Sequence, residues 1–565
     1  MKNQKKQNII QLIFALVIIL LINYISSQTF FRLDLTADKR YTLSDATHEI
    51  LDSINEIVFV EIYLDGDMPI GFQRMQKSIK ELLDEFRVIA GKNIQYTFIN
   101  PSASNDQSKR DAIYHDLYDR GLDPTNVKDR GREGGVAEKI LFPGAIITYG
   151  DNATPVNFLK NNPAFSAEVN LNNSIQDLEY ELVDAIHKIT TKSRKKIAFI
   201  EGQNELDEFE TGDITKELAE YYAIDRVTIK EYLNILDPYD AIIIAGPEEE
   251  YTEKSKFIID QYIMNGGKVL WFIDAVTVNM DSLSTGSSTF ALMNDVNLYD
   301  QLFKYGVRIN PNVIQDIQCA VIPVNTAVSR GQPKFVPAPW LYYPLLISPN
   351  NHPVTKSLNM IKAEFPSVID TVGKGIDITK KVLLSSSANA RIFNAPLLIN
   401  LAQVREQINP ATFKKAHLPI AVLLKGTFES VFKNRYLKNI IEKNDFSYKQ
   451  TSVPTKMIVV SDADIIRNEV RERADGIFIS PLGYDRYTKQ TYGNKEFVMN
   501  AVHYLVDQKG LLELRSREIK LRILDKAKIM DERVKWQIIN TVFPIIFIIL
   551  FGGIIIYYRK RKYTA

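Results

Sequence analysis

Two long apolar runs without charged residues lie near the ends of this chain. The first covers Ile9–Ile25, in an uncharged stretch that reaches Phe31, and the second covers Ile538–Tyr558. The hydrocarbon core of a bilayer is about 30 Å thick, and about 20 apolar residues cross it as a helix. The pattern therefore predicts two transmembrane helices, over residues 9–31 and 537–558, with the bulk of the chain between them.

Basic residues at the chain ends indicate how the two spans are oriented. Three lysines precede the first run within residues 1–8, and four basic residues follow the second run within residues 559–565. Positively charged flanks favour the cytoplasmic side, so we expect both termini in the cytoplasm and the bulk outside it. Basic residues such as Arg32 and Arg533 also lie on the inner flanks, so charge alone leaves the opposite orientation open.

The first run also has the position of a secretory signal peptide. Its end at Ile25 and the following residues Ser26–Phe31 lack the small-residue pattern of a cleavage site. We therefore expect an uncleaved anchor, which a mature chain starting near Gln28 would contradict.

After the first run, short apolar segments alternate with amphipathic ones. Ile57–Tyr63 has the composition of a buried strand, and Met75–Ile89 carries a helical stripe of apolar residues. Ser44 is placed to cap a short helix, and Ser174–Thr190 reads as a helix capped by Ser174, with Asp177 at the capping-box position. Strands that alternate with helices predict a first α/β domain over residues 32–190.

A second series of strands follows a basic linker. Ile197–Ile200, Ala241–Ala245 and Lys268–Ile273 are apolar strands that end in glycine or acidic turns, with amphipathic helices between them. This pattern predicts a doubly wound parallel sheet. As a resemblance, the unit is also similar to amidotransferase- and flavodoxin-like folds. The predicted domain covers residues 191–510, with an irregular, proline-containing insertion around residues 282–410.

The complete prediction is an α/β protein. Two tandem α/β units form an ectodomain flanked by an N-terminal and a C-terminal transmembrane helix. A charged juxtamembrane helix over residues 511–536 leads into the second span.

Composition excludes several classes of function. Hydrophobic content of 45% and charged content of 24% are those of an ordinary globular protein. The net charge is +1, but residues 7–558 carry six more acidic than basic side chains, so nucleic acid is not an expected partner. Cys319 is the only cysteine, which excludes an internal disulfide and a cysteine-based zinc site. It lies in a predicted strand and reads as a structural thiol rather than a nucleophile.

The sequence contains no motif for a nucleotide, a metal ion or a catalytic serine. There is no P-loop, no G-x-G-x-x-G, no H-E-x-x-H and no G-x-S-x-G, and the six histidines are scattered singly. We therefore predict no catalytic residue, no cofactor and no metal site, so the expected protein is not an enzyme.

Two acidic loops follow predicted strands, where α/β sheets place their ligands. The residues concerned are Glu201, Gly202, Asn204 and Glu205 in the first loop and Asp462 and Asp464 in the second. Such carboxylates can bind a partner or ligand, or serve in acid–base chemistry. The pattern favours turn formation, because no nucleophile or base partner is evident. A partner- or ligand-binding role is the alternative.

The second span contains Pro544, Gly552 and Gly553. Small residues let helices approach closely, and neighbouring helices can satisfy the backbone at a proline kink. The span can thus dock on another membrane protein or serve as a simple anchor, and the sequence leaves both open.

Several segments resemble the ABC-transporter auxiliary family. They are Phe31-Arg-Leu-Asp-Leu-Thr, Arg40-Tyr-Thr-Leu-Ser, Leu178-Glu-Tyr-Glu-Leu, Ile197-Ala-Phe-Ile-Glu-Gly-Gln-Asn-Glu-Leu and Ser461-Asp-Ala-Asp. The layout as a whole is similar to the gliding-motility branch of that family. The resemblance implies an inner-membrane subunit with a periplasmic ectodomain. It also implies a separate permease, a separate cytoplasmic ATPase, and contacts with other gliding or envelope proteins.

The leading hypothesis is a non-enzymatic subunit of a gliding-motility ABC transporter complex, whose ectodomain binds a partner or solute. The alternative is a periplasmic module, independent of a transporter, in which the Glu201–Glu205 loop senses a glycan or small solute. A third reading, a cryptic hydrolase, would use Asp462 and Asp464.

Overall fold

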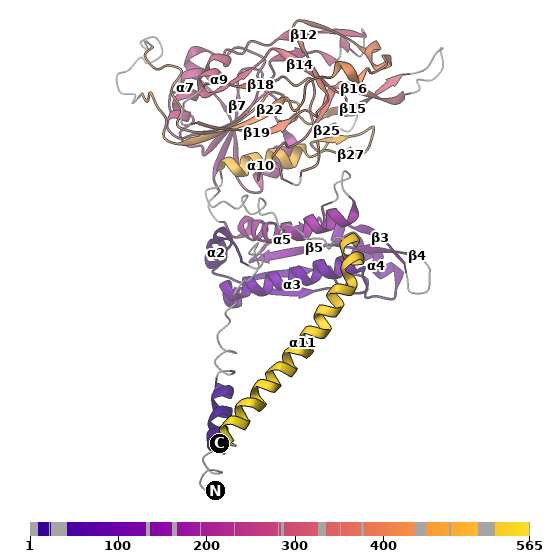
Figure 1. Ribbon diagram of the computed structural model, residues 1–565. Helices are drawn as coiled ribbons and strands as arrows, with labels where there is room; N and C mark the ends of the chain where they lie inside the picture. Colours follow the sequence, from indigo (N-terminus) through magenta and orange to yellow (C-terminus); the bar gives the residue numbers. More distant parts are fainter. Residues whose placement is uncertain are drawn as a thin grey trace. The chain divides into compact units, whose positions relative to one another are not determined.

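The computed structural model describes most of the chain (Figure 1). The described residues are 10–21, 23, 42–130, 136–160, 166–191, 194–230, 232–280, 282–283, 287–325, 335–350, 352–356, 358–373, 378–435, 448–473, 476–506 and 526–563. They fall into two units, one formed by residues 1–32 with 43–517 and one by residues 33–42 with 518–565. The boundary predicted at residue 190 lies inside the first unit and stays a prediction.

The N-terminal part of the first unit is built on a four-stranded sheet with the order β2-β1-β5-β6. Its strands are β1 (Val58–Ile62), β2 (Ile94–Phe98), β5 (Gly144–Tyr149) and β6 (Asn152–Asn157), and β3 (Thr125–Arg130) pairs with β4 (Val136–Leu141) in a separate hairpin. The helices are α2 (Asp45–Asp52), α3 (Ile70–Ala90), α4 (Gln107–Asp119) and α5 (Ala167–Thr190), and η1 (Gly91–Asn93) is a 3-10 turn. The predicted strand over 57–63 and the predicted helix over 75–89 are confirmed.

The helix caps show which helix ends are determined by local sequence and which are determined by tertiary packing. Ser44 caps α2 as predicted, because its Oγ accepts a hydrogen bond from the N–H of Thr47 at 3.0 Å. The cap predicted at Ser174 is wrong, because α5 begins seven residues earlier, after Ser166. The added turns bury Leu171 against Gly71 of α3. A Cβ added at residue 71 would lie 2.4 Å from the Leu171 side chain. Ser174 is instead buried within α5 and accepts from the N–H of Lys160 at 2.9 Å.

The C-terminal part of the first unit is organised by a seven-stranded sheet with the order β19-β22-β23-β10-β9-β7-β8. The strands are β7 (Lys196–Glu201), β8 (Ala223–Thr228), β9 (Ala241–Ala245), β10 (Lys268–Phe272), β19 (Ile378–Ser385), β22 (Pro419–Gly426) and β23 (Thr455–Val460). Five of them are parallel, and their chain order across the sheet is 2-1-3-4-5, that of a flavodoxin-like fold.

The predicted parallel sheet is confirmed for these five strands, and two further strands differ from the prediction. β22 pairs with β23 in an antiparallel sense, and β19 pairs with β22 in the same way. Both strands belong to the long segment between β10 and β23. Antiparallel neighbours in a sheet can be joined without a crossover helix.

Helices cover both faces of this sheet. α6 (Gly212–Ala219) and α10 (Asn494–Val506) share one core with Phe199, Ile243 and Leu270. α7 (Glu253–Met264) and α9 (Tyr299–Tyr305) share the other core with Ile242, Ile244 and Trp271. Alternate residues of a strand point to opposite faces, so β9 is apolar and buried at all five positions.

The segment predicted as an irregular insertion is rich in small sheets. These pair in the orders β11-β12-β21, β13-β18, β14-β20 and β15-β16-β17. Their bounds are β11 (Val276–Val278), β12 (Ser288–Met293), β13 (Val307–Ile309), β14 (Asn312–Asp316), β15 (Cys319–Asn325), β16 (Phe335–Leu346), β17 (Ile361–Lys362), β18 (Ile369–Thr371), β20 (Ala390–Asn394) and β21 (Leu397–Asn400). The hairpins β24 (Val470–Arg473) with β25 (Gly476–Ile479) and β26 (Tyr484–Asp485) with β27 (Gln490–Thr491) follow β23, and η2 (Leu401–Arg405) and η3 (Pro410–Thr412) are 3-10 turns. The strand predicted around Cys319 is confirmed as β15, and most of the other strands were not predicted, because they draw their stability from distant partners.

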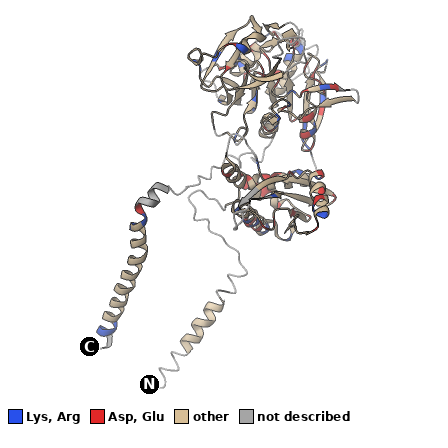
Figure 2. Ribbon diagram, turned by 90° about the vertical axis from the view of Figure 1, so that its right-hand side faces the viewer, with Lys and Arg blue, Asp and Glu red and all other residues tan. Residues whose placement is uncertain are grey.

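The second unit is dominated by α11 (Lys526–Tyr563), a 38-residue helix that is apolar along most of its length and basic at its C-terminal end (Figure 2). Within the described residues, the segment Glu532–Arg561 is the one helix long and apolar enough to cross a membrane. It contains the predicted span 537–558. Residues 526–536 of the predicted juxtamembrane helix continue into it, and 511–525 lie outside the described residues.

The predicted first span is described only in part. Residues Ile10–Leu21 form an apolar helix that is shorter than a membrane span. Most of the remainder of residues 9–31 lies outside the described residues. A membrane-spanning role for this segment, and with it the two-span arrangement, stays a prediction.

Candidate functional site

The carboxyl ends of the five parallel strands meet at one edge of the seven-stranded sheet. Contacts between the loops that leave this edge are close. Ala463 donates its N–H to Oδ1 of Asp274 at 2.8 Å. Gly246 has a φ of 63°, and a Cβ added there would lie 2.9 Å from the Cβ of Ala463. A side chain at residue 246 would therefore push these loops apart.

The loop after β7 lies at the point where the strand order reverses, since β8 and β9 flank β7 on opposite sides. This is the position at which open α/β sheets bind ligands. The side chains of the loop already have partners. Glu201 forms an ion pair with Arg226 of β8, and Asn204 donates to Oε2 of Glu248 at 2.6 Å.

The other end of this loop is held in the same way. Glu205 accepts from the N–H of Gln203 at 2.7 Å and from the hydroxyl of Tyr251. Burial raises the pKa of Glu205 above its ordinary value. Gly202, with a φ of 121°, and Asn204, with a φ of 54°, supply the left-handed backbone that the turn requires.

The loop after β23 gathers carboxyl groups. Asp462 accepts from the N–H of Asp464 at 2.9 Å and from the N–H of Glu364 at 2.8 Å. Burial, the neighbouring carboxylate of Asp464 and that of Asp274 raise the pKa of Asp462 well above its ordinary value. Asp462 thus organises the loop by binding its backbone.

Asp464 has a different environment. Its Oδ1 lies 2.6 Å from Nη1 of Arg467, and burial raises its pKa to about 7. Arg467 opposes that rise, while Glu364 and Asp274 add to it. Arg467 also reaches Glu210, with 3.4 Å between Nε and Oε1, so it joins two loops.

A second ion pair lies beside the first. Nζ of Lys362 is 2.8 Å from Oε1 of Glu364. Burial alone would raise the pKa of Glu364, but the Lys362 ammonium lowers it below the ordinary value. The carboxylate, in turn, raises the pKa of Lys362 despite the burial of that lysine. Both groups are therefore charged at neutral pH.

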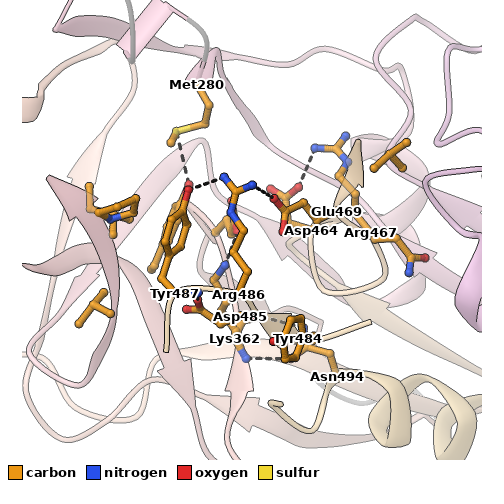
Figure 3. A pocket seen from close by; sticks show the side chains of 18 of the residues that line it. Met280, Lys362, Asp464, Arg467, Glu469, Tyr484, Asp485, Arg486, Tyr487 and Asn494 are labelled. Carbon is orange, nitrogen blue, oxygen red and sulfur yellow. Dashed lines mark hydrogen bonds and ion pairs between the residues drawn. The ribbon is translucent and has the colours of Figure 1, made fainter. Parts of the chain in front are cut away.

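These ion pairs line a cavity of about 730 Å³ (Figure 3). Three tyrosines, Tyr343, Tyr484 and Tyr487, contribute to its walls, together with a third ion pair between Arg486 and Glu469. The apolar part of the lining consists of Met280, Leu283, Val321, Ile322, Pro323, Leu401, Val470 and Pro481. The cavity thus combines fixed charges, aromatic rings and aliphatic surface.

The structure separates the residues that the sequence singled out. Asp464 lines the cavity, whereas Asp462 holds its loop and the Glu201–Glu205 loop does not contribute to the lining. Lys362, Glu364 and Arg486 were not anticipated. The charged run from Arg467 to Arg473 could have indicated part of this charged wall. Nothing in the sequence indicated that Lys362 lies beside it.

The described residues show no arrangement specific to metal or nucleophilic chemistry. Among them, no group of three or more His, Cys, Asp and Glu side chains is placed to hold a metal ion. Burial and the nearby carboxylate of Asp316 raise the pKa of the half-buried Cys319 to about 11, which disfavours the thiolate. The cavity presents charged and hydrogen-bonding groups.

In α11, Pro544 lies inside the helix, and Gly552 and Gly553 form a small-residue step. Within the described part of the chain, a Cβ added at either glycine would have no heavy atom within 4 Å. The structure therefore leaves room beside this step.

Comparison with known proteins places the chain in a family. The family model described as ABC-type uncharacterized transport system matches residues 194–501, more than half of the chain. The chain belongs to this auxiliary family. All residues that line the cavity fall between 210 and 494, so the cavity lies within the part of this auxiliary protein that defines the family. A second model, a domain of unknown function, matches residues 37–148.

Relatives and solved structures extend the comparison. An uncharacterized protein of Borreliella burgdorferi is 22% identical over 578 residues and covers 100% of both chains. The mmIFT52 N-terminal domain is 12% identical, with a TM-score of 0.31, over 55% of the auxiliary protein and 97% of the solved chain. A putative ThuA-like protein from Parabacteroides merdae is 11% identical, with a TM-score of 0.27, over 56% and 90%. Structural likeness at these TM-scores carries no functional inference.

Proposed function

We propose that this auxiliary-family protein is a non-enzymatic, membrane-anchored subunit of an ABC transporter complex. The supporting observation is the family match, which covers the seven-stranded sheet and its cavity. The chain has no Walker motif, so ATP hydrolysis would be the work of a separate cytoplasmic ATPase beside a separate permease. The ectodomain would then bind a partner or solute through the cavity or the neighbouring loops.

The detailed form of this proposal follows the sequence resemblance. We propose an inner-membrane protein with two spans, a periplasmic ectodomain and cytoplasmic termini. The layout resembles GldG, a gliding-motility member of the family, so the complex would act in gliding. The apolar length of α11 supports membrane anchoring, and the gliding role is supported by the resemblance alone.

Affinity purification from native membranes tests the proposal. The tagged chain, extracted in mild detergent, is expected to carry with it a multi-span permease and an ATPase with a Walker motif, identified by mass spectrometry. A tagged two-span protein of unrelated function is the matched control. Repeated recovery of the chain without either partner, while the control behaves as usual, would contradict a role as a transporter subunit.

A ligand-sensing module independent of a transporter is the second candidate. The cavity of about 730 Å³ is the observation that favours it, because that volume suits a small ligand. This candidate would be favoured if the chain binds a ligand but no permease is recovered with it in the membrane purification. A hydrolase is not proposed, since Asp462 binds backbone N–H groups and Asp464 is paired with Arg467.

A further inference from the structure

The cavity beside Asp464 has a lining in which each of the three cations is already paired with a carboxylate of the protein. Three ion pairs contribute: Lys362 with Glu364 at 2.8 Å, Arg467 with Asp464 at 2.6 Å, and Arg486 with Glu469 at 3.1 Å. The two further carboxylates of the lining are also engaged: Glu210 lies 3.4 Å from Arg467, and Asp485 accepts from the N–H of Tyr487 at 2.8 Å.

This matching disfavours a strongly charged ligand. An anionic group that entered the cavity would have to compete with the carboxylate already paired with each cation. A cationic group would have to compete with those cations, or at Asp485 with a backbone N–H. Displacing one member of a partly buried ion pair leaves the other charge uncompensated. A neutral ligand avoids that penalty, because it can bind to both members of a pair without separating them.

The paired groups retain capacity for further hydrogen bonds. A guanidinium carries five N–H donors and a carboxylate about four acceptor positions, and one ion pair uses only part of each. The Nε of Arg467 is buried and, among the described residues, has no hydrogen-bond partner of good geometry, only the 3.4 Å ion-pair contact with Glu210. Adjacent hydroxyl groups on a ligand can accept from the guanidinium and donate to the carboxylate.

The rest of the lining suits the non-polar side of such a ligand. Tyr487 is 49% exposed, and the guanidinium of Arg486 lies 4.5 Å from the centroid of its ring, which holds the ring at the cavity wall. Tyr343 is buried, with Nζ of Lys362 5.0 Å from its ring centroid. Val321 and Ile322 of β15 add aliphatic surface. Sugar rings present C–H groups on their faces and hydroxyls at their edges, which fits this combination.

We propose that the cavity binds a neutral sugar, with hydroxyl groups on the ion-pair wall and ring C–H groups on the tyrosine and aliphatic lining. A short oligosaccharide is the expected size, because about 730 Å³ lies in the range of small-molecule sites. The inference rests on the proposed binding role of the ectodomain and names the ligand class for it. The site differs from the Glu201–Glu205 loop, which does not line the cavity.

Ligand-observed NMR and calorimetry test the inference on the full chain in a detergent without a sugar head group. The probes are maltose, cellobiose and the N-acetylglucosamine disaccharide. The dipeptides Phe-Arg amide and Phe-Glu serve as cationic and anionic comparators. At least one disaccharide is expected to bind more tightly than either dipeptide. Tyr487→Ala is expected to weaken that binding by about tenfold or more.

A matched control and a parallel measurement make the result decisive. Tyr232 is 77% exposed and does not line the cavity, so Tyr232→Ala should leave sugar binding unchanged. The inference is overturned if none of the disaccharides binds, if a charged dipeptide binds more tightly, or if Tyr487→Ala has no effect. Recovery of permease and ATPase is measured on the same preparation, so failure to bind sugar while both partners are present overturns the ligand class alone.

Discussion

Nη1 of Arg467 lies 2.6 Å from Oδ1 of Asp464, and both residues belong to the loop after β23 that forms part of the cavity wall. The same guanidinium reaches Glu210, which precedes α6, at 3.4 Å. Arg467 is thus the cation paired with Asp464. The carboxyl groups of Asp274, Asp462 and Glu364 lie close to the same pair.

Arg467→Leu is expected to destabilise the fold. The substitution leaves Asp464 without its cation among other carboxyl groups, and breaking a buried pair costs about 3–5 kcal/mol. Arg467 is about one-third exposed, so we expect a loss of about 2 kcal/mol in the free energy of unfolding at pH 7.5, measured by urea denaturation.

Two further variants test the reason for that loss. Adding Asp464→Asn to Arg467→Leu should restore part of the stability, because it removes the carboxylate charge that has lost its cation. Arg435→Leu breaks exposed pairs with Glu253 and Asp300 and should cost less than about 0.5 kcal/mol. Equal losses for Arg435→Leu and Arg467→Leu would show that the Asp464 pair is an ordinary surface contact.

Titration of Asp464 should contribute to the pH dependence of the free energy of unfolding. Burial raises its folded pKa to about 7, above that of the unfolded chain, so the folded state retains a proton that the unfolded state releases. The contribution of this group to stability therefore falls as pH rises from about 4 to about 7, by at most about 1.4 kcal/mol per pH unit.

The test compares the wild type with Asp464→Asn by denaturation between pH 5 and pH 7.5. The variant should lose less stability than the wild type over this interval, because its side chain does not titrate. Asp237→Asn, at an exposed position, is the control and should follow the wild-type curve. Parallel curves for the wild type and Asp464→Asn would mean that the carboxyl group is already ionised at pH 5.

Thiol labelling tests the proposed topology. The single cysteine allows a cysteine-free background through Cys319→Ser, into which one new cysteine is placed at a time. In spheroplasts, a membrane-impermeant maleimide should label Tyr232→Cys, at an exposed loop position, before lysis. Thr564→Cys, in the basic tail, should be labelled only after lysis. The reverse pattern would place the large domain in the cytosol.

The glycine step of α11 is expected to contact the permease. Gly552→Leu combined with Gly553→Leu fills the space beside the helix and should lower permease recovery about fivefold in the membrane purification. Ile548→Leu, which changes the shape of an exposed apolar side chain on the same helix, should leave recovery unchanged. Unchanged recovery with the double variant would show that α11 is a simple anchor.

Sequence patterning located the elements that depend on local signals. The predicted strand Ala241–Ala245 agrees with β9 at both ends. Ser44 was recognised as a cap because an N-cap is decided by residues within one turn of each other. The apolar run at the C-terminal end was recognised for a similar reason, since its length and composition are local properties.

Tertiary structure decided the features that depend on residues far apart in the chain. α5 extends to Ala167 because Leu171 packs on Gly71, about 100 positions away. β19 and β22 join the large sheet as antiparallel strands because their partners are supplied by the fold. The cavity wall has the same origin: Lys362 and Arg467 are 105 positions apart, and only folding makes their carboxylate partners neighbours. Local patterning reports how a segment buries its own apolar face. Sheet order, and the meeting of these two local ion pairs, are set by the contacts that the folded chain makes.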